Sequence, residues 1–235
     1  MKRTFTFFSI ALVSLFACTA CFDLDEYLFF KKDGSGKFSF IVDMSKMMSM
    51  SKMLGDEAKK EDDGSAQVNS AFDKKEESIK AIKGISHYTR IEDTVNYKFG
   101  FSFDFTNVTA LNKALNIVFS NDSAGPVTDY TYFEYKNNQL MRLEPSNINS
   151  LISGSSSPQP AAAASSTKNK LFDFDALFSD VTYNTTYEFE EAVDSVSNEN
   201  SLLNNSRTRV SLSCHPLAKD SASMACSLKN KIFLK

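Results

Sequence analysis

The most constraining feature of the sequence is a stretch in which apolar and polar residues alternate without a break. Residues 95–105 read VNYKFGFSFDF, so every second side chain from Val95 to Phe105 is apolar and those between them are polar or small. Because successive side chains of a β-strand point to opposite faces, this period predicts a long strand with one buried and one solvated face. Such a strand needs neighbouring strands at its edges and an apolar layer over one face.

The same alternation recurs along the chain, with short polar turns between the alternating stretches. It is found in KFSFIVD (37–43), YNTTYEF (183–189), TRVSLSC (208–214) and MACSLKNKIFL (224–234), and YKNNQLMRL (135–143) has the pattern of a hairpin. A helical period is found in 43–55, 71–84 and 107–118. These patterns predict an α+β fold: a curved antiparallel β-sheet built from hairpins, with two or three helices packed on one face.

Two segments of low complexity interrupt these patterns. Residues 56–69 are charged and small, which predicts a mobile loop, and residues 153–168 (SGSSSPQPAAAASSTK) form a Ser/Ala/Pro-rich linker. Residues 22–150 then form the first part of the domain. The strands in 171–235 are too few for a stable core of their own, since a segment of about 65 residues is marginal alone, so we expect them to complete the same sheet.

The N-terminus has the pattern of an export signal. Lys2 and Arg3 precede an apolar run, 5–16, that is too short to span a membrane and typical of a signal peptide. The run ends in SLFACTAC, residues 14–21, which contains two approximate lipoprotein cleavage motifs. One has a bulky Phe before its last small residue, and the other has Cys where Leu is usual. The sequence predicts a signal peptide over 1–17, or alternatively 1–20.

The residue after the cleaved signal is the expected site of lipid attachment. We expect lipidation, with diacylglycerol and a fatty acid such as palmitate, at Cys18 or alternatively at Cys21. An ordinary secretory signal cut near Ala20 stays open as a further alternative. The predicted location is the cell envelope, with the protein anchored by lipid to the outer membrane on its periplasmic or surface face. In this oxidising compartment Cys214 and Cys226 are a candidate disulfide pair.

Asp33-Gly34-Ser35-Gly36 contains a fragment shared with calcium-binding loops. Aligned on such a loop, the first ligand position would hold Lys31 and the twelfth Val42, where carboxylates are required. Both flanking stretches have strand rather than helix character. The sequence therefore predicts a tight hairpin turn and no metal site here.

A methionine-rich stretch and the Phe-rich strand are the candidates for binding an apolar molecule. The candidate ligand-facing residues are Met44, Met47, Met48, Phe99, Phe101 and Phe103. Thioethers also bind Cu(I), so periplasmic copper handling through the Met-rich helix is an alternative function. The methionines spread over more than half of a helix circumference, which does not favour one compact metal site.

Catalytic motifs are absent from the sequence. It contains no H-E-x-x-H, G-x-S-x-G or Walker pattern and only two His, so we expect a non-enzymatic protein without a cofactor. An enzyme with an unrecognised site stays open. The formal net charge of -3 gives no basic excess for binding nucleic acid. The expected partners are the membrane, through the acyl groups, and a hydrophobic ligand or an envelope protein.

The order of these features resembles a group of known proteins. The stretches EYLFFKKDGSGKFSFIVDMSKM (26–47), GISHYTRIEDTVNYKFGFSFDFTNVTALNKALN (84–116) and TTYEFEEAVDSVSNENSLLNNSRTRVSLSC (185–214) resemble small envelope lipoproteins of Bacteroidota. More distantly, the chain resembles LppM-type lipoprotein domains, which implies a helix-and-sheet shape suited to hydrophobic ligands. Neither resemblance implies an activity or a residue role. FDLDE (22–26), if it follows a lipidated Cys21, resembles the signal for export to the cell surface.

Overall fold

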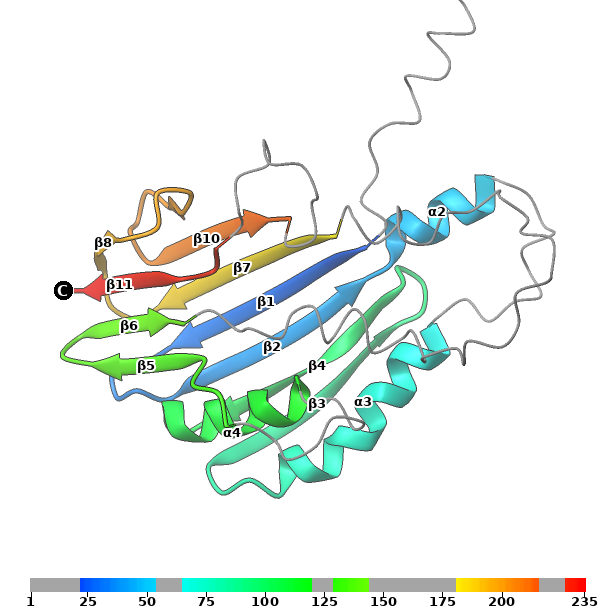
Figure 1. Ribbon diagram of the computed structural model, residues 1–235, viewed down its shortest axis with the longest axis horizontal. Helices are drawn as coiled ribbons and strands as arrows, with labels where there is room; N and C mark the ends of the chain where they lie inside the picture. The colour runs from blue at the N-terminus through cyan, green and yellow to red at the C-terminus, as the bar shows by residue number, and fades with distance from the viewer. Residues whose placement is uncertain (1–21, 54–64, 120–128, 144–180, 216–226) are drawn as a thin grey trace, which may run out of the picture.

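The computed structural model describes residues 22–53, 65–119, 129–143, 181–215 and 227–235, which form an α+β fold (Figure 1). A seven-stranded sheet has the order β3-β4-β2-β1-β7-β10-β9, and a four-stranded sheet has the order β5-β6-β11-β8. The larger sheet contains β1 (Asp23–Phe30), β2 (Gly36–Asp43), β3 (Ile85–Asp93), β4 (Lys98–Phe105), β7 (Thr182–Phe189), β9 (Leu202–Leu203) and β10 (Arg209–Cys214). The smaller sheet contains β5 (Phe133–Lys136), β6 (Gln139–Arg142), β8 (Val193–Val196) and β11 (Asn230–Leu234).

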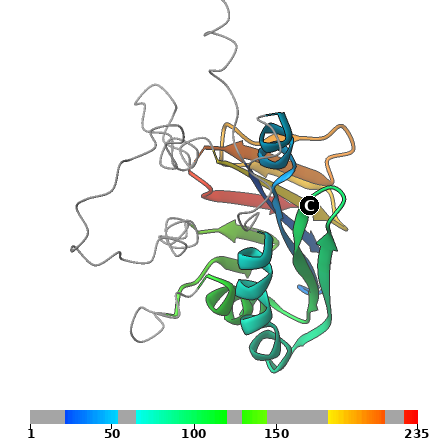
Figure 2. The same cartoon turned by 90° about the vertical axis from the view of Figure 1, so that its right-hand side faces the viewer.

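The predicted fold class is confirmed, with a second sheet that the sequence did not predict. Helices α3 (Ser65–Lys80) and α4 (Val108–Val118) and the smaller sheet all lie on one face of the larger sheet (Figure 2). Helix α2 (Ser45–Met53) lies at one end of the sheet. No described helix is long and apolar enough to cross a membrane.

The turn between β1 and β2 confirms the hairpin predicted at Asp33. The two strands pair antiparallel from Asp23 opposite Asp43 to Phe30 opposite Gly36. The Asp33 carboxylate accepts hydrogen bonds from the backbone N–H of Ser35 at 2.9 Å and from its hydroxyl at 2.6 Å. Gly34 has a φ of 82°, a left-handed conformation that glycine adopts without steric cost. The carboxylate is therefore used to close the turn.

Strand β1 lies at the centre of the larger sheet and joins the two halves of the chain. It pairs antiparallel with β2 and parallel with β7, with Leu24 opposite Tyr183 and Leu28 opposite Tyr187. A parallel pair of strands needs a long connection. Here the connection between β1 and β7 contains β2 to β6 and the helices. Strands β7, β9 and β10 thus extend the larger sheet, whereas β8 and β11 belong to the smaller one. The linker predicted at 153–168 lies outside the described residues.

Helices α2 and α4 begin close to the predicted positions, whereas α3 begins earlier than predicted. The Asn107 side chain caps α4 by accepting a hydrogen bond from the backbone N–H of Ala110 at 2.9 Å. The Asp43 carboxylate accepts one from the N–H of Ser45 at 3.0 Å, at the start of α2. Helix α3 begins at Ser65, so it includes residues 65–69 of the range predicted as a mobile loop. The sequence pattern missed this first part of α3 because it carries few large apolar side chains.

The strand predicted over 95–105 begins later than its alternating pattern indicates. Strand β4 starts at Lys98, and Val95 lies in the β3–β4 turn with an exposed fraction of 82%. Asp93 accepts hydrogen bonds from the backbone N–H groups of Val95 and Asn96 at 3.1 and 2.9 Å, and Tyr97 has a φ of 56°. The prediction that Val95 and Tyr97 continue the buried face of the strand is therefore wrong, because the Asp93 side chain closes a turn there.

Candidate functional site

The predicted ligand-facing phenylalanines lie in the hydrophobic core. Phe99, Phe101 and Phe103 are almost completely buried. The Phe101 ring stacks on Phe103 at 6.0 Å and meets Phe72 of α3 edge-on at 5.3 Å. Of the predicted methionines on or beside α2, Met44 is buried, whereas Met47 and Met48 are half-buried. A role of these six residues in ligand binding stays a prediction, as does copper handling; the described residues contain no cluster of three His, Cys, Asp or Glu suited to a metal.

A buried ionic cluster, formed by Glu26, Arg142, Tyr183 and Tyr187, joins the two sheets. Arg142 Nη2 of β6 donates a hydrogen bond to Glu26 Oε2 of β1 at 2.9 Å, and both side chains are completely buried. The Tyr183 hydroxyl donates to the same carboxylate oxygen at 2.7 Å. The Tyr187 hydroxyl donates to Glu26 Oε1 at 2.8 Å. One carboxylate thus accepts hydrogen bonds from three side chains in the space between the sheets.

The electrostatics of the buried cluster follow from its burial and its two charges. Burial, and then the Glu26 carboxylate, raise the pKa of Tyr183 and Tyr187 well above the ordinary value of tyrosine. Burial, the largest influence, would lower the pKa of Arg142, but the interactions with Glu26, Tyr187 and Tyr183 together outweigh it and raise that pKa overall. Burial also raises the pKa of Tyr132 to about 12. Both tyrosines of the cluster are therefore neutral donors at neutral pH.

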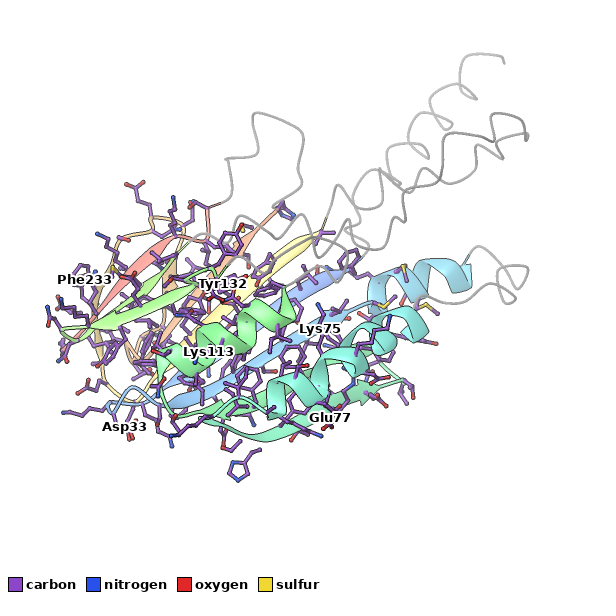
Figure 3. The ribbon with its side chains drawn as sticks, turned by 60° about the horizontal axis from the view of Figure 1, so that its bottom comes forward. Asp33, Lys75, Glu77, Lys113, Tyr132 and Phe233 are labelled. Carbon is purple, nitrogen blue, oxygen red and sulfur yellow. The ribbon has the colours of Figure 1, made fainter. Side chains whose placement is uncertain are left out.

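The buried cluster leaves polar atoms without partners. Arg142 Nε and Nη1 and the Tyr132 hydroxyl, all buried, have no hydrogen-bond partner in the described part of the chain. The guanidinium lies over the rings of Phe133 at 4.7 Å and Tyr132 at 5.8 Å. Figure 3 shows Tyr132 beside α4, over the centre of the larger sheet. Because Glu26 already balances the charge of Arg142, a neutral oxygen, such as that of water, suits these donors better than a second anion.

A surface hollow of about 360 Å³ lies at the opposite end of β1 from α2, beside the Asp33 turn. Its lining includes Phe29, Lys31, Lys37, His87, Asp104 and Phe105. Figure 3 shows Asp33 at this end of the sheet, away from α2. Aromatic carbon and three basic side chains thus share one concave surface, which suits an apolar group that carries a negative charge.

A bulge in β3 places His87 at the rim of this hollow. The register between β3 and β4 shifts between Ser86 and Thr89, and His87 has a φ of 49°. Its Nδ1 lies 2.9 Å from Asp104 Oδ2. Asp104 also lies opposite Lys37 in the β2–β4 register, but Lys37 forms no salt bridge with the described residues. Lys37, like Lys31, is therefore a basic group of the hollow that can attract an anion.

Of the four cysteines to which a role was assigned from the sequence, only Cys214 lies within the described residues. Cys214, at the end of β10, is disulfide-bonded and largely buried. Cys226 lies outside the described residues, so its pairing with Cys214 stays a prediction. Cys18 and Cys21 also lie outside them, as does the rest of the predicted signal peptide.

No protein-family model and no curated protein matches the sequence. Among solved structures, the folded domain of the LppM protein of Mycobacterium tuberculosis, determined by NMR, is similar to this chain. The similarity covers 92% of this chain and 91% of that chain, with 12% sequence identity and a TM-score of 0.39. A similarity at this level carries no activity and no residue role to this chain.

Proposed function

We propose that this protein is a lipid-anchored, non-enzymatic binding module of the cell envelope, held on the outer membrane. The observation that carries this proposal is the sequence position at which the folded domain begins. The central strand β1 starts at Asp23, and Phe22 alone separates it from Cys21. The folded domain thus follows the candidate lipidated cysteine directly. The disulfide at Cys214 supports export, because disulfides persist in oxidising compartments.

The hollow beside the Asp33 turn is the surface we propose for binding. Phe29 offers apolar contact, and Lys31 and Lys37 offer positive charge. This combination supports an apolar ligand with an acidic group. The carboxylate of Glu26 is a poor candidate for catalysis, because it is enclosed between the sheets and accepts hydrogen bonds from three donors.

Removing the acylated cysteine is expected to abolish lipid attachment. Cells that produce the wild type, Cys18→Ala, Cys21→Ala and the double variant would be grown with labelled palmitate, and the label on the protein measured. We expect one single variant and the double variant to lose the label, because only the first residue of the mature chain is acylated. Cys226→Ala is the matched control and keeps the label. An unlabelled wild type, or a labelled double variant, would contradict the anchor.

Reversing the charge of Lys37 is expected to release a copurified ligand. Native mass spectrometry of delipidated protein from its own envelope would detect the ligand as an added mass. Lys37→Glu should lower its occupancy about tenfold or more, because it replaces attraction by repulsion inside the hollow. Lys231→Glu makes the same change on an exposed position of β11 and should leave occupancy unchanged. Equal occupancy in both variants would exclude the hollow as the binding surface.

A further inference from the structure

The link between the lipid anchor and the fold is too short to act as a flexible tether. An extended residue spans at most about 3.6 Å, so Asp23 lies within about 7 Å of an acylated Cys21 or about 18 Å of an acylated Cys18. Asp23 begins the central strand of the larger sheet. An acyl group inserted in the membrane therefore brings this end of the sheet, which we call the anchored end, to the membrane surface.

The anchored end consists of the start of β1, helix α2 and the β3–β4 turn. Asp43, at the end of β2, lies opposite Asp23, and α2 follows it directly. The Met44 N–H donates a hydrogen bond to the Tyr97 carbonyl at 2.9 Å, which ties the start of α2 to the β3–β4 turn. Figure 1 shows α2 and this turn at the same end of the sheet, and Figure 2 looks onto that end.

Two lysines at the anchored end are paired with carboxylates, and the Asp93 carboxylate is held by the backbone N–H groups of its own turn. Lys46 Nζ lies 2.8 Å from Asp23, and Lys98 Nζ lies 2.9 Å from Asp43. These two pairs add no net charge to the surface. An acidic protein is repelled by anionic lipid, but this pairing weakens the repulsion where the chain approaches the membrane.

Apolar side chains are also available for contact at the anchored end. Val95 is 82% exposed at the tip of the β3–β4 turn. Met47 and Met48 are half-buried on α2. An exposed valine gains free energy when it enters the boundary between lipid headgroups and acyl chains, and flexible methionine side chains adapt to such a surface.

We propose that the anchored end rests on the lipid surface of the membrane that holds the acyl anchor, with Val95 inserted at the headgroup boundary. This contact rests on the proposed function, because the acyl group supplies the attachment and the contact fixes the orientation. The eight residues of β1 span about 26 Å, so the hollow at its other end faces away from the membrane. A ligand or partner in the envelope space then reaches the hollow without meeting the lipid.

Single tryptophan variants test this contact, because the sequence contains no Trp. The acylated variants Val95→Trp and Leu202→Trp would be placed in vesicles of phosphatidylethanolamine and phosphatidylglycerol, with or without brominated acyl chains. Leu202 is the matched control, since it is 75% exposed but lies away from the anchored end: it pairs with Ser211 of β10, which is level with Tyr27 in the middle of β1. We expect brominated lipid to quench Val95→Trp severalfold more strongly than Leu202→Trp. Thr94→Trp, on the same turn, repeats the measurement.

The outcomes separate this contact from the anchor itself. If the protein floats with the vesicles but brominated lipid quenches Val95→Trp and Thr94→Trp no more than Leu202→Trp, the contact is wrong and the anchor stands. If the protein is not acylated and does not float, the proposed function fails, and the contact fails with it. Circular dichroism of each variant before reconstitution verifies that the fold is intact.

Discussion

Arg142→Met is expected to lower the free energy of unfolding by about 3–5 kcal/mol. The substitution keeps most of the side-chain volume but leaves the Glu26 carboxylate buried between the sheets without its opposite charge. The two tyrosine hydroxyls that remain satisfy its hydrogen bonds but not its charge. Equilibrium unfolding in urea, followed by circular dichroism, measures the change.

The control for Arg142→Met is an ion pair on the surface. Arg209 Nη2 lies 3.2 Å from Glu188, with side-chain exposures of 50% and 31%, so Arg209→Met should cost at most about 1 kcal/mol. Glu26→Gln added to Arg142→Met should recover about 1–2 kcal/mol, because it removes the buried charge and keeps an acceptor for the tyrosines. If Arg142→Met costs no more than Arg209→Met, the buried cluster does not hold the two sheets together.

Stability is expected to fall steeply above about pH 10 because of Tyr183 and Tyr187. Their pKa values are raised well above that of an unfolded tyrosine, so below pH 10 both states keep the protons and these groups add no pH dependence. Above it, the unfolded state loses protons that the folded state retains, which favours unfolding by up to about 1.4 kcal/mol per pH unit for each tyrosine. Urea unfolding at a series of alkaline pH values measures this slope.

Conservative variants assign the alkaline slope to the buried cluster. Tyr187→Phe should reduce it, because one of the two retained protons is then absent from the folded state. Tyr183→Phe should reduce it likewise, because the other proton retained by the cluster is then absent. An unchanged slope in Tyr187→Phe would mean that other groups cause the alkaline loss of stability.

Local features of the fold could be predicted because their causes are local. The Asp33 turn, the Asn107 cap and the hairpin between β5 and β6 each depend on side chains within a few residues. Asn137 and Asn138 have φ values of 54° and 56° at the tip of that hairpin, a conformation that asparagine tolerates. The alternating pattern likewise identified the buried faces of β2, β4 and β7.

Features that depend on distant contacts could not be predicted. No pattern within β1 or β7 indicates that they pair in parallel, because strand period is the same in either direction. The division of β7 to β11 between two sheets could not be predicted for the same reason, because strand period does not indicate which strands pair. The buried cluster did leave one signal: Glu26 stands at an inward position between Leu24 and Leu28, where a charge requires a buried partner. Identifying that partner as Arg142 required the packing of the sheets.

The hollow was also beyond prediction, because three separate segments bring its side chains together. Lys37 comes from β2, His87 from the bulge in β3 and Asp104 from β4. No local sequence pattern relates His87 to the Asp33 turn. Of the predicted binding residues, those on or beside α2 lie at the anchored end, and those of β4 lie in the core.

The central claim is that an acylated cysteine directly precedes the folded sheet. Intact-mass spectrometry of the protein, extracted with detergent from its own envelope, tests this claim most directly. The account predicts a mature chain that starts at Cys18 or Cys21 and carries diacylglycerol and fatty acid on that residue. A chain of all 235 residues, or a shortened chain without an acyl group, would contradict it.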